Sequence, residues 1–269
     1  MAIKTVVVGA AGRMGRELVT AVLRDPETEL VGAVEHEECP LLGRDAGSLA
    51  GCEEAGVAVT GDLPAALREA EAIIDFSSVE AVVGNARLAT EAGCAVVIGT
   101  TGLDDQVRQR LAELARQGGR IVFAPNMSVG VNLLFELCRQ VAPILGEDYD
   151  IEVVEMHHNQ KKDAPSGTAV RLGEILAEAS GRDYRRDAVH GRQGMVGART
   201  SREIGMHAVR GGDVVGDHTV IFATGGERVE LIHKASSRQT FCKGALRAVK
   251  FLANSRAGLF DMQDVLGLR

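Results

Sequence analysis

The sequence predicts an α/β fold in which a parallel sheet with helices on both faces is followed by a second α+β domain carrying an open mixed sheet. Short apolar runs of strand length alternate with amphipathic helical patterns through the first 127 residues, as in repeated βα units. A glycine-rich turn lies directly after the first run. Beyond residue 200 the strand-like runs follow one another with little helix between them, which indicates a change of architecture.

Composition and charge limit the classes of protein to consider. The chain has 269 residues, of which 30 are Lys or Arg and 37 are Asp or Glu, giving a formal charge of −7. This acidic balance argues against nucleic acid or an anionic membrane surface as a partner. There is no Trp and aromatic residues make up 3%, so stacking platforms for single-stranded nucleic acid are not expected.

The cysteines and the N-terminus suggest a cytoplasmic protein. Five cysteines are scattered without a C-x-x-C pair, which predicts reduced thiols and neither a disulfide framework nor a metal site. The chain enters its first apolar run without a signal-peptide pattern. We expect no apolar run to approach the roughly 20 residues that a membrane-spanning helix needs.

The first βαβ unit carries the pattern of a dinucleotide-binding, Rossmann-like domain. A strand at Ile3–Val8 leads into glycines at 9, 12 and 15, and the helical pattern follows at once. Glycines permit a tight turn and close approach of a pyrophosphate, whose charge faces the helix N-terminus. Glu35 ends the next strand, Leu30–Glu35, at the distance where an acidic side chain binds both ribose hydroxyls of NAD. Many βα turns need glycine for packing alone, and the G-x-x-G-x-x-G spacing departs from the stricter fingerprint.

Further βα units complete the first domain. Its other strands are predicted at Val57–Thr60, Ala72–Phe76, Ala95–Ile98 and Arg120–Ala124, and its helices at Pro64–Glu69, Val79–Ala92 and Asp104–Gln117. Ligands of such sheets bind beyond the carboxyl ends of the strands. We therefore expect four segments to face one crevice: Gly9–Gly15, Ser77–Ser78, Gly99–Gly102 and Ala124–Ser128.

The second domain is predicted to begin near residue 128. Its elements are a helix at Val129–Leu145, a strand from Ile151 to His157, a helix at Thr168–Ala179, a loop at Gly181–Thr200 and three strands at Arg202–Val209, Val214–Ala223 and Arg228–His233. A last helix at Phe241–Ala253 and the tail are expected to return to the first domain. The resulting domains are residues 1–127 plus 239–269, for the dinucleotide, and residues 128–238, for substrate binding and oligomerisation.

The stretch from Glu155 to Thr168 concentrates the chemistry of the second domain. It reads Glu-Met-His-His-Asn-Gln-Lys-Lys-Asp-Ala-Pro-Ser-Gly-Thr, and it joins the end of a strand to the start of a helix. Imidazoles, ammonium groups and a helix N-terminus make a site for a carboxylate or phosphate with a proton donor beside it. Other histidines, among them His218 and His233, are interpreted as structural or solvated.

This stretch also resembles a known family. The run from Glu155 to Thr168 is similar to the signature of the 4-hydroxy-tetrahydrodipicolinate (dihydrodipicolinate) reductases. Similar family segments occur in the same order as Gly-Ala-Ala-Gly-Arg-Met-Gly at 9–15, Val-Ile-Gly-Thr-Thr-Gly at 97–102, Asn-Met-Ser-Val-Gly-Val-Asn at 126–132, His-Lys-Ala-Ser-Ser-Arg at 233–238 and Gly-Leu-Phe-Asp-Met at 258–262.

The resemblance implies an oxidoreductase of the diaminopimelate route to lysine that uses NADH, NADPH or both. It further implies a cyclic dicarboxylate substrate and a homotetramer assembled mainly through the second sheet. His157 would donate or accept a proton and Lys161 would donate one. His158, Ser166, Gly167, Thr168 and Thr101 would bind substrate. The cofactor would lie against Gly9, Ala10, Ala11, Gly12, Arg13, Met14, Glu35, His36, Gly99, Thr100, Thr101, Ala124, Pro125, Asn126 and Met127.

Two departures from the family pattern bear on the cofactor. His36 stands where members that favour NADPH carry Arg, and Ser77-Ser78 stands where some carry an Arg in the loop after the fourth strand. A guanidinium suits a 2′-phosphate, whereas a mostly neutral imidazole suits it poorly. We therefore expect NADH to be used at least as well as NADPH.

Two other functions compete with this interpretation. A semialdehyde dehydrogenase of similar two-domain build needs a Cys nucleophile with a His base, and Cys138 lies in a helical stretch poorly placed for that role. A redox sensor that binds NAD(H) and changes shape would not need the polar cluster, so replacing His157 would leave its function intact.

Overall fold

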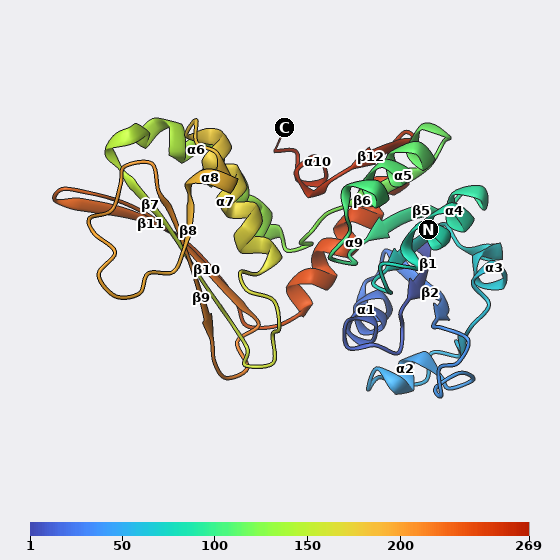
Figure 1. Cartoon of the computed structure of the whole chain (residues 1–269). Helices are drawn as coiled ribbons and strands as arrows, with labels where there is room; N and C mark the ends of the chain where they lie inside the picture. Colours follow the sequence, from blue (N-terminus) through green and yellow to red (C-terminus); the bar gives the residue numbers. More distant parts are fainter. Residues whose placement is uncertain (269) are drawn as a thin grey trace. The chain divides into compact units, whose positions relative to one another are not determined.

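The computed structural model describes residues 1–268 and divides into two compact units. The first unit comprises Met1–Val129 together with Arg238–Arg269, and the second comprises Gly130–Ser237 (Figure 1). The chain therefore leaves the first unit once and returns to it at Arg238, just before the helix Gln239–Ala253.

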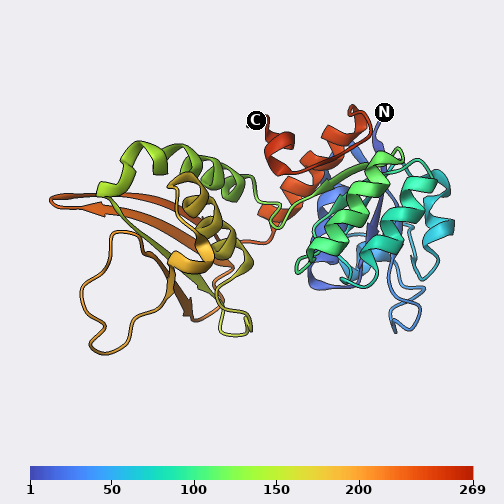
Figure 2. The same ribbon diagram turned by 45° about the horizontal axis from the view of Figure 1, so that its top comes forward.

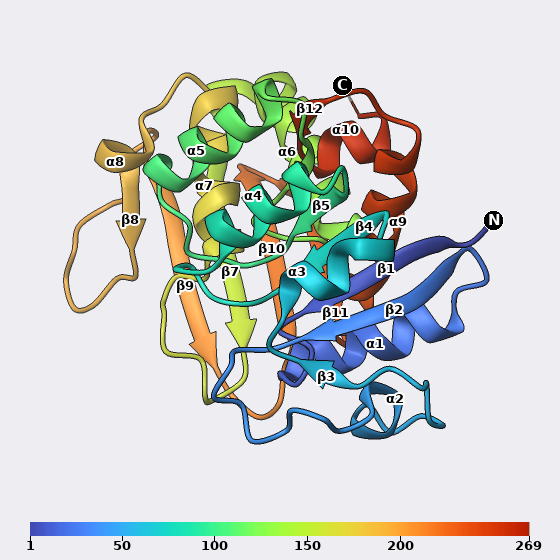
Figure 3. The ribbon, with the colours of Figure 1, turned by 90° about the vertical axis from the view of Figure 1, so that its right-hand side faces the viewer.

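The first unit is built on a seven-stranded sheet whose strands are all parallel. The strand order is β12-β6-β5-β4-β1-β2-β3, so the order reverses between β1 and β4 (Figure 3). This is the order of a Rossmann sheet with one strand added beyond β6. The strands are β1 (Ile3–Val8), β2 (Thr28–Val34), β3 (Val59–Thr60), β4 (Ala72–Asp75), β5 (Ala95–Ile98), β6 (Arg120–Phe123) and β12 (Gly258–Phe260).

Helices cover both faces of this sheet because its strands are apolar on both sides. Alternate residues of β1 enter different cores: Val7 packs with α1 and α9, whereas Val6 and Val8 pack with α3, α4 and α5. The helices of this unit are α1 (Arg13–Arg24), α2 (Ala46–Leu49), α3 (Leu63–Ala66) with a 3₁₀ turn at Leu67–Glu69, α4 (Val82–Glu91), α5 (Asp105–Arg116), α9 (Gln239–Ala253) and α10 (Met262–Leu266).

The second unit is a five-stranded mixed sheet with the order β11-β10-β7-β9-β8. β7 pairs antiparallel with β10 and parallel with β9. Helices α6 and α7 pack on one face, where they enclose an apolar core (Figure 2). The elements are α6 (Val129–Leu145), a 3₁₀ turn (Gly146–Asp148), β7 (Asp150–His157), α7 (Gly167–Ala179), α8 (Tyr184–Asp187), β8 (Ala188–His190), β9 (Ile204–Arg210), β10 (Gly216–Thr224) and β11 (Glu227–Ala235).

The predicted fold class is confirmed, and the errors concern short elements. The stretch expected to be a loop at Gly181–Thr200 contains α8 and β8, and the tail contains β12 and α10. These pieces have three to five residues, too few for a hydrophobic period to be visible. Their pairing partners lie far away in the sequence, as when β12 joins β6.

One expectation about apolar runs is wrong. The helical stretch Val129–Asp148 is long and apolar enough to pass a membrane-span test by length and composition. Core helices of soluble proteins pass the same test. One side of α6, including Leu134, Phe135 and Cys138, packs into the core of the second unit, whereas Leu133, Leu137 and Ile144 are exposed.

Candidate active site

The glycine turn after β1 has the geometry of an anion-binding loop. Gly9 has φ +79°, and a Cβ there would lie 2.8 Å from the Phe76 carbonyl oxygen. A Cβ on Gly15 would lie 2.0 Å from the Gly9 carbonyl oxygen, so this helix position admits only glycine. Gly12 caps α1 without a side-chain hydrogen bond, which leaves the first N–H groups of the helix available to an anion.

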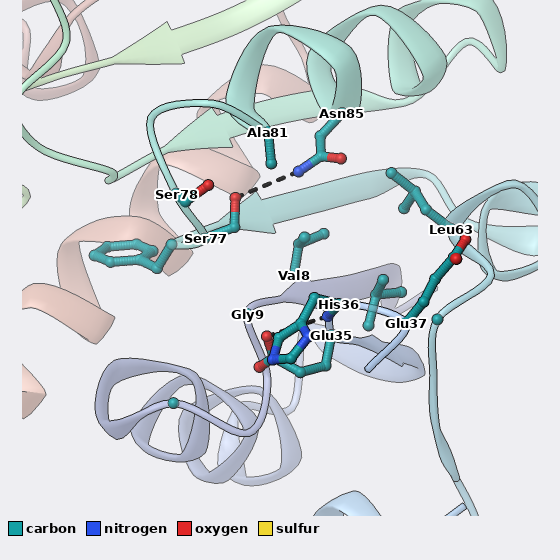
Figure 4. A pocket seen from close by; sticks show the side chains of 14 residues that line it. Val8, Gly9, Glu35, His36, Glu37, Leu63, Ser77, Ser78, Ala81 and Asn85 are labelled. Atoms are coloured by element: carbon teal, nitrogen blue, oxygen red, sulfur yellow. Dashed lines mark hydrogen bonds between the residues drawn. The ribbon is translucent and has the colours of Figure 1, made fainter. Parts of the chain in front are cut away.

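Next to this turn lies a cleft of about 620 Å³ at the carboxyl ends of β1, β2 and β4 (Figure 4). Glu35 lies in it and accepts a hydrogen bond from the Ala11 N–H at 3.1 Å. The cleft thus combines a helix N-terminus with a carboxylate at its edge. The lining residues are Val8, Gly9, Gly12, Val34, Glu35, His36, Glu37, Gly61, Leu63, Phe76, Ser77, Ser78, Ala81 and Asn85. None of these described residues is Lys or Arg.

A second cleft of about 390 Å³ shares Phe76, Ser77 and Ser78 with the first. It is also lined by Met14 and by Gly99–Thr101. The turns after β1, β4 and β5 therefore meet at one edge of the sheet, as expected. Arg13 is exposed at the start of α1.

The segment after β6 is placed differently. Ala124 and Met127 are buried in the core at 1% and 2% exposure, and Pro125 and Asn126 are half-buried. None of the four lines either cleft. The Asn126 side chain instead accepts a hydrogen bond from the Ser128 N–H at 2.8 Å, which shapes the turn into α6.

A buried carboxyl group lies at this edge and was not predicted from the sequence. Asp75, the last residue of β4, is fully buried and accepts hydrogen bonds from the Ser77 N–H (2.8 Å), the Ser77 hydroxyl (2.6 Å) and the Asn85 amide (2.9 Å). Burial raises the pKa of Asp75, against the effect of these bonds. Asp75 thereby fixes the loop that both clefts share. The visible signal was an acidic residue closing the apolar strand Ala72–Asp75.

In the second unit, strand periodicity brings the polar cluster onto one face. Burial alternates along β7, so Glu155 and His157 project to the same side as the core residues Ile151 and Val153. His157 is 9% exposed, and its Nδ1 lies 2.6 Å from a Glu155 carboxylate oxygen. The ring of His218 meets the His157 ring edge-on at a centroid distance of 5.3 Å.

The loop after β7 and the start of α7 complete this cluster. Lys161 pairs with Asp163 at 2.9 Å and keeps 20% of its side chain exposed, whereas Lys162 is exposed. Ser166 caps α7 by accepting from the Ala169 N–H. His158 is half-buried, Gly167 is exposed and Thr168 is 9% exposed. Thr101 belongs to the other unit.

The side chains give little support to a cysteine nucleophile or to a metal site. Cys138 is fully buried in α6, and burial raises the pKa of its thiol to about 12, so it cannot supply a thiolate nucleophile near neutral pH. Among residues 1–268, no group of three or more His, Cys, Asp or Glu side chains is arranged to hold a metal ion.

Comparisons with known proteins cover nearly the whole chain. The family description "Dihydrodipicolinate reductase, N-terminus" matches residues 3–127, and "Dihydrodipicolinate reductase, C-terminus" matches residues 130–266. The chain is 51% identical over 267 residues to a 4-hydroxy-tetrahydrodipicolinate reductase of Syntrophotalea carbinolica, covering 99% of this chain and 100% of that protein.

Comparison with solved structures supports the same family. A dipicolinate-bound dihydrodipicolinate reductase from Paenisporosarcina sp. TG-14 superimposes with a TM-score of 0.78 at 26% identity, covering 98% of this chain and 99% of the other. A scyllo-inositol dehydrogenase from Lactobacillus casei shares the fold alone, with a TM-score of 0.60 at 14% identity and 99% and 93% coverage. The chain belongs to the dihydrodipicolinate reductase family, the NAD(P)H-dependent oxidoreductases of diaminopimelate and lysine biosynthesis.

Proposed function

We propose that this chain reduces 4-hydroxy-tetrahydrodipicolinate with His157 as its principal proton donor. The observation that carries the proposal is the cluster of His157, Lys161 and the α7 N-terminus, in a chain whose other unit carries a dinucleotide turn. In this proposal residues 1–127 plus 239–269 bind the dinucleotide, and residues 128–238 bind substrate and form the oligomer.

The residue chemistry suits this reaction. Bound NADH or NADPH supplies the hydride. Elimination of the substrate's 4-hydroxyl group, which leaves as water with a proton from the neighbouring carbon, would first give a conjugated C=C–C=N system. Hydride added to the C=C end of this system moves negative charge towards the ring nitrogen and the neighbouring carbon, which is then protonated. An imidazole is a suitable donor near neutral pH. The Lys161 ammonium group stabilises the developing anion and provides a second proton source.

The substrate carboxylates are assigned to the start of α7, with help from His158 and Thr101. The exposed backbone of Gly167 and the hydroxyl of Thr168 lie at the positive end of the helix. Ser166 is less suited to direct contact. Its N–H donates to Glu155, and its Oγ accepts from Ala169 and lies 3.2 Å from His218 Nε2. We therefore give Ser166 a positioning role.

The ribose site supports use of NADH at least as well as NADPH. Glu35, His36 and Glu37 line the cleft beside the glycine turn, together with Ser77 and Ser78. Two carboxylates repel a 2′-phosphate, whereas Glu35 can accept hydrogen bonds from free ribose hydroxyls. The proposed cofactor wall comprises Gly9–Met14, Glu35, His36 and Gly99–Thr101. We give Ala124–Met127 a supporting role, because Ala124 and Met127 are buried and none of the four residues lines either cleft.

We also propose a cytoplasmic homotetramer assembled through the second sheet. One face of this sheet is covered by α6 and α7. The strand registers place apolar side chains on the opposite face, namely Val154, Met156, Val209, Ile221 and Ile232, together with charged ones such as Glu152, Asp217, Glu230 and Lys234. Ile232 is 52% exposed and Val209 43%. Apolar side chains that stay exposed on a sheet face, with charged ones around them, support a subunit interface there.

A direct assay tests the reaction. The condensation product of aspartate semialdehyde and pyruvate is mixed with the purified full chain, and nicotinamide oxidation is followed with NADH and, separately, with NADPH. Turnover that depends on the condensation product is expected. Oxidation at the same rate without that product, or none with either cofactor, would contradict the proposed function.

A further inference from the structure

We propose that Glu155, held by Arg210, is a positioning residue that fixes His157 through its Nδ1 and leaves Nε2 as the nitrogen that exchanges protons with substrate. The inference deepens the proposed function and rests on the role given there to His157. It assigns specific tasks to two residues, one on β7 and one at the end of β9, that do not themselves contact substrate.

Glu155 is 1% exposed, and both oxygens of its carboxylate hydrogen-bond to other residues of the protein. Arg210 donates two hydrogen bonds to Glu155, from Nη1 to Oε2 at 2.8 Å and from Nη2 to Oε1 at 2.9 Å. Oε2 also meets His157 Nδ1 at 2.6 Å, and Oε1 accepts from the Ser166 N–H at 3.0 Å. A two-point guanidinium contact restricts rotation of the carboxylate, so the imidazole meets an acceptor of fixed orientation.

The carboxylate remains ionised throughout the working pH range. Burial by itself raises the pKa of Glu155, but hydrogen bonds from His157, Arg210 and the Ser166 N–H bring it down to about 2. An ionised carboxylate can only accept a hydrogen bond. Nδ1 must therefore carry the proton of this short contact, both when the imidazole is neutral and when it is charged.

The surroundings of Nε2 fit the remaining role. A Cβ on Gly216 would lie 3.0 Å from His157 Nε2, so the glycine keeps space beside that nitrogen. His218 stands edge-on to the ring, and its burial, with the neighbouring His157 charge, lowers its pKa to about 3. His218 therefore stays neutral at working pH and does not compete as a proton source.

The same carboxylate links the proton donor to the substrate-binding helix. The Ser166 N–H that donates to Glu155 belongs to the N-cap of α7. Arg210 Nη2 also donates to the Asp163 carbonyl at 2.6 Å, in the loop that carries Lys161. Glu155 and Arg210 thus hold the imidazole, the lysine loop and the helix start in one hydrogen-bonded unit.

The first test determines the tautomer of His157 by ¹⁵N NMR, in the absence of substrate. The full chain is labelled with ¹⁵N-histidine, and the signal of His157 is identified by its loss in His157→Gln. When the ring is neutral, the inference predicts a proton on Nδ1 and a bare Nε2. A proton on Nε2, or the rapidly exchanging mixture seen for exposed histidines, would overturn the inference.

The second test is kinetic. Glu155→Gln is expected to lower kcat about 10- to 100-fold and to move the high-pH limb of the kcat profile to lower pH by about one unit, because the imidazolium loses its anionic partner. The groups around His157 are Glu155 on β7, Arg210 on β9, His218 on β10 and Lys161 in the following loop. Of these, Glu155 is the anionic one. Glu155→Asp is expected to restore the position of the limb.

Glu152→Gln is the matched control. Glu152 lies on the same strand and also binds arginines and a histidine, namely Arg192, Arg199 and His207, but it projects to the opposite face of the sheet. Its replacement should leave the pH limb in place. An unmoved limb in Glu155→Gln, with only a lower melting temperature, would reduce Glu155 to a structural residue and contradict the inference.

The two proposals can fail separately. A histidine with its proton on Nε2 in an active reductase contradicts the positioning role alone. A chain that does not reduce the condensation product contradicts the proposed function, whatever tautomer His157 adopts.

Discussion

At the residue scale, cofactor choice is expected to depend on the side chain at position 36. His36→Arg places a guanidinium beside Glu35, where the 2′-phosphate of NADPH would lie. We expect the wild-type chain to use NADH at least as well as NADPH. His36→Arg should shift the ratio of kcat/KM values towards NADPH about tenfold, or about 1.4 kcal/mol. A tenfold NADPH preference in the wild-type chain would contradict this account.

The residues of the site were predictable to different degrees. The polar run that carries His157 and Lys161 between a strand end and a helix start was visible in the sequence, whereas the roles proposed for these two residues come from the family resemblance. Arg210 lies 55 residues beyond Glu155 and reaches it only because β9 pairs with β7. Ser166 was expected to contact substrate, but in the structure it hydrogen-bonds to Glu155 and Ala169 and lies beside His218, which β10 brings close.

At the element scale, the loop after β4 is expected to determine how well the dinucleotide binds. Asp75→Ala removes the acceptor of three short hydrogen bonds and releases Ser77. Each buried donor left without a partner costs about 1–3 kcal/mol. We expect KM for NADH to rise about tenfold with a smaller change in kcat. Asn85→Ala, which removes a single donor, should have a weaker effect. Equal KM values for Asp75→Ala and wild type would contradict this role.

Strand β7 is also expected to make the protein sensitive to acid. The pKa values of Glu152 and Glu155 are both about 2 in the folded chain, against about 4.5 when unfolded. Because the folded values are the lower ones, the stabilisation is fully present above about pH 4.5 and is lost as pH falls towards 2.

Denaturant unfolding measured between pH 7 and pH 3 checks this expectation. The wild-type free energy of unfolding should decrease over that interval, with about 1–3 kcal/mol from each carboxylate. Glu155→Gln should have a lower free energy of unfolding at pH 7, and that free energy should decrease less than in the wild type as the pH falls. The exposed Glu54→Gln is the control and should follow the wild type. If the free energy of unfolding of Glu155→Gln fell with pH in parallel with that of the wild type, this would contradict Glu155 as a source of the acid sensitivity.

Long periodic elements were predicted well and short ones were not. The helix Val129–Leu145 and the strands Ile3–Val8 and Ala95–Ile98 have the expected bounds. The N-cap of α5 is Asp104, which accepts a hydrogen bond from the Val107 N–H. By contrast, β8 and β12 gain their stability from pairing with β9 and β6. Tertiary pairing of this kind leaves no local pattern to detect.

At the scale of the whole molecule, the face of the second sheet opposite α6 and α7 is expected to bind other copies of the chain. Light scattering at micromolar concentration should give about four times 28.5 kDa. Ile232→Asp places a charge on this face and should produce smaller species. Leu133→Asp changes an exposed residue of α6, on the covered side, and should not. A monomeric wild-type chain would contradict the tetramer.

The measurement that tests the account most directly is the kcat of His157→Ala with saturating NADH and condensation product. Lys162→Ala is the matched control, because Lys162 is an exposed cation of the same loop. If His157 delivers the proton, kcat should fall at least about 100-fold in His157→Ala, while Lys162→Ala stays near wild type. A His157→Ala enzyme that turns over at the wild-type rate would contradict the account.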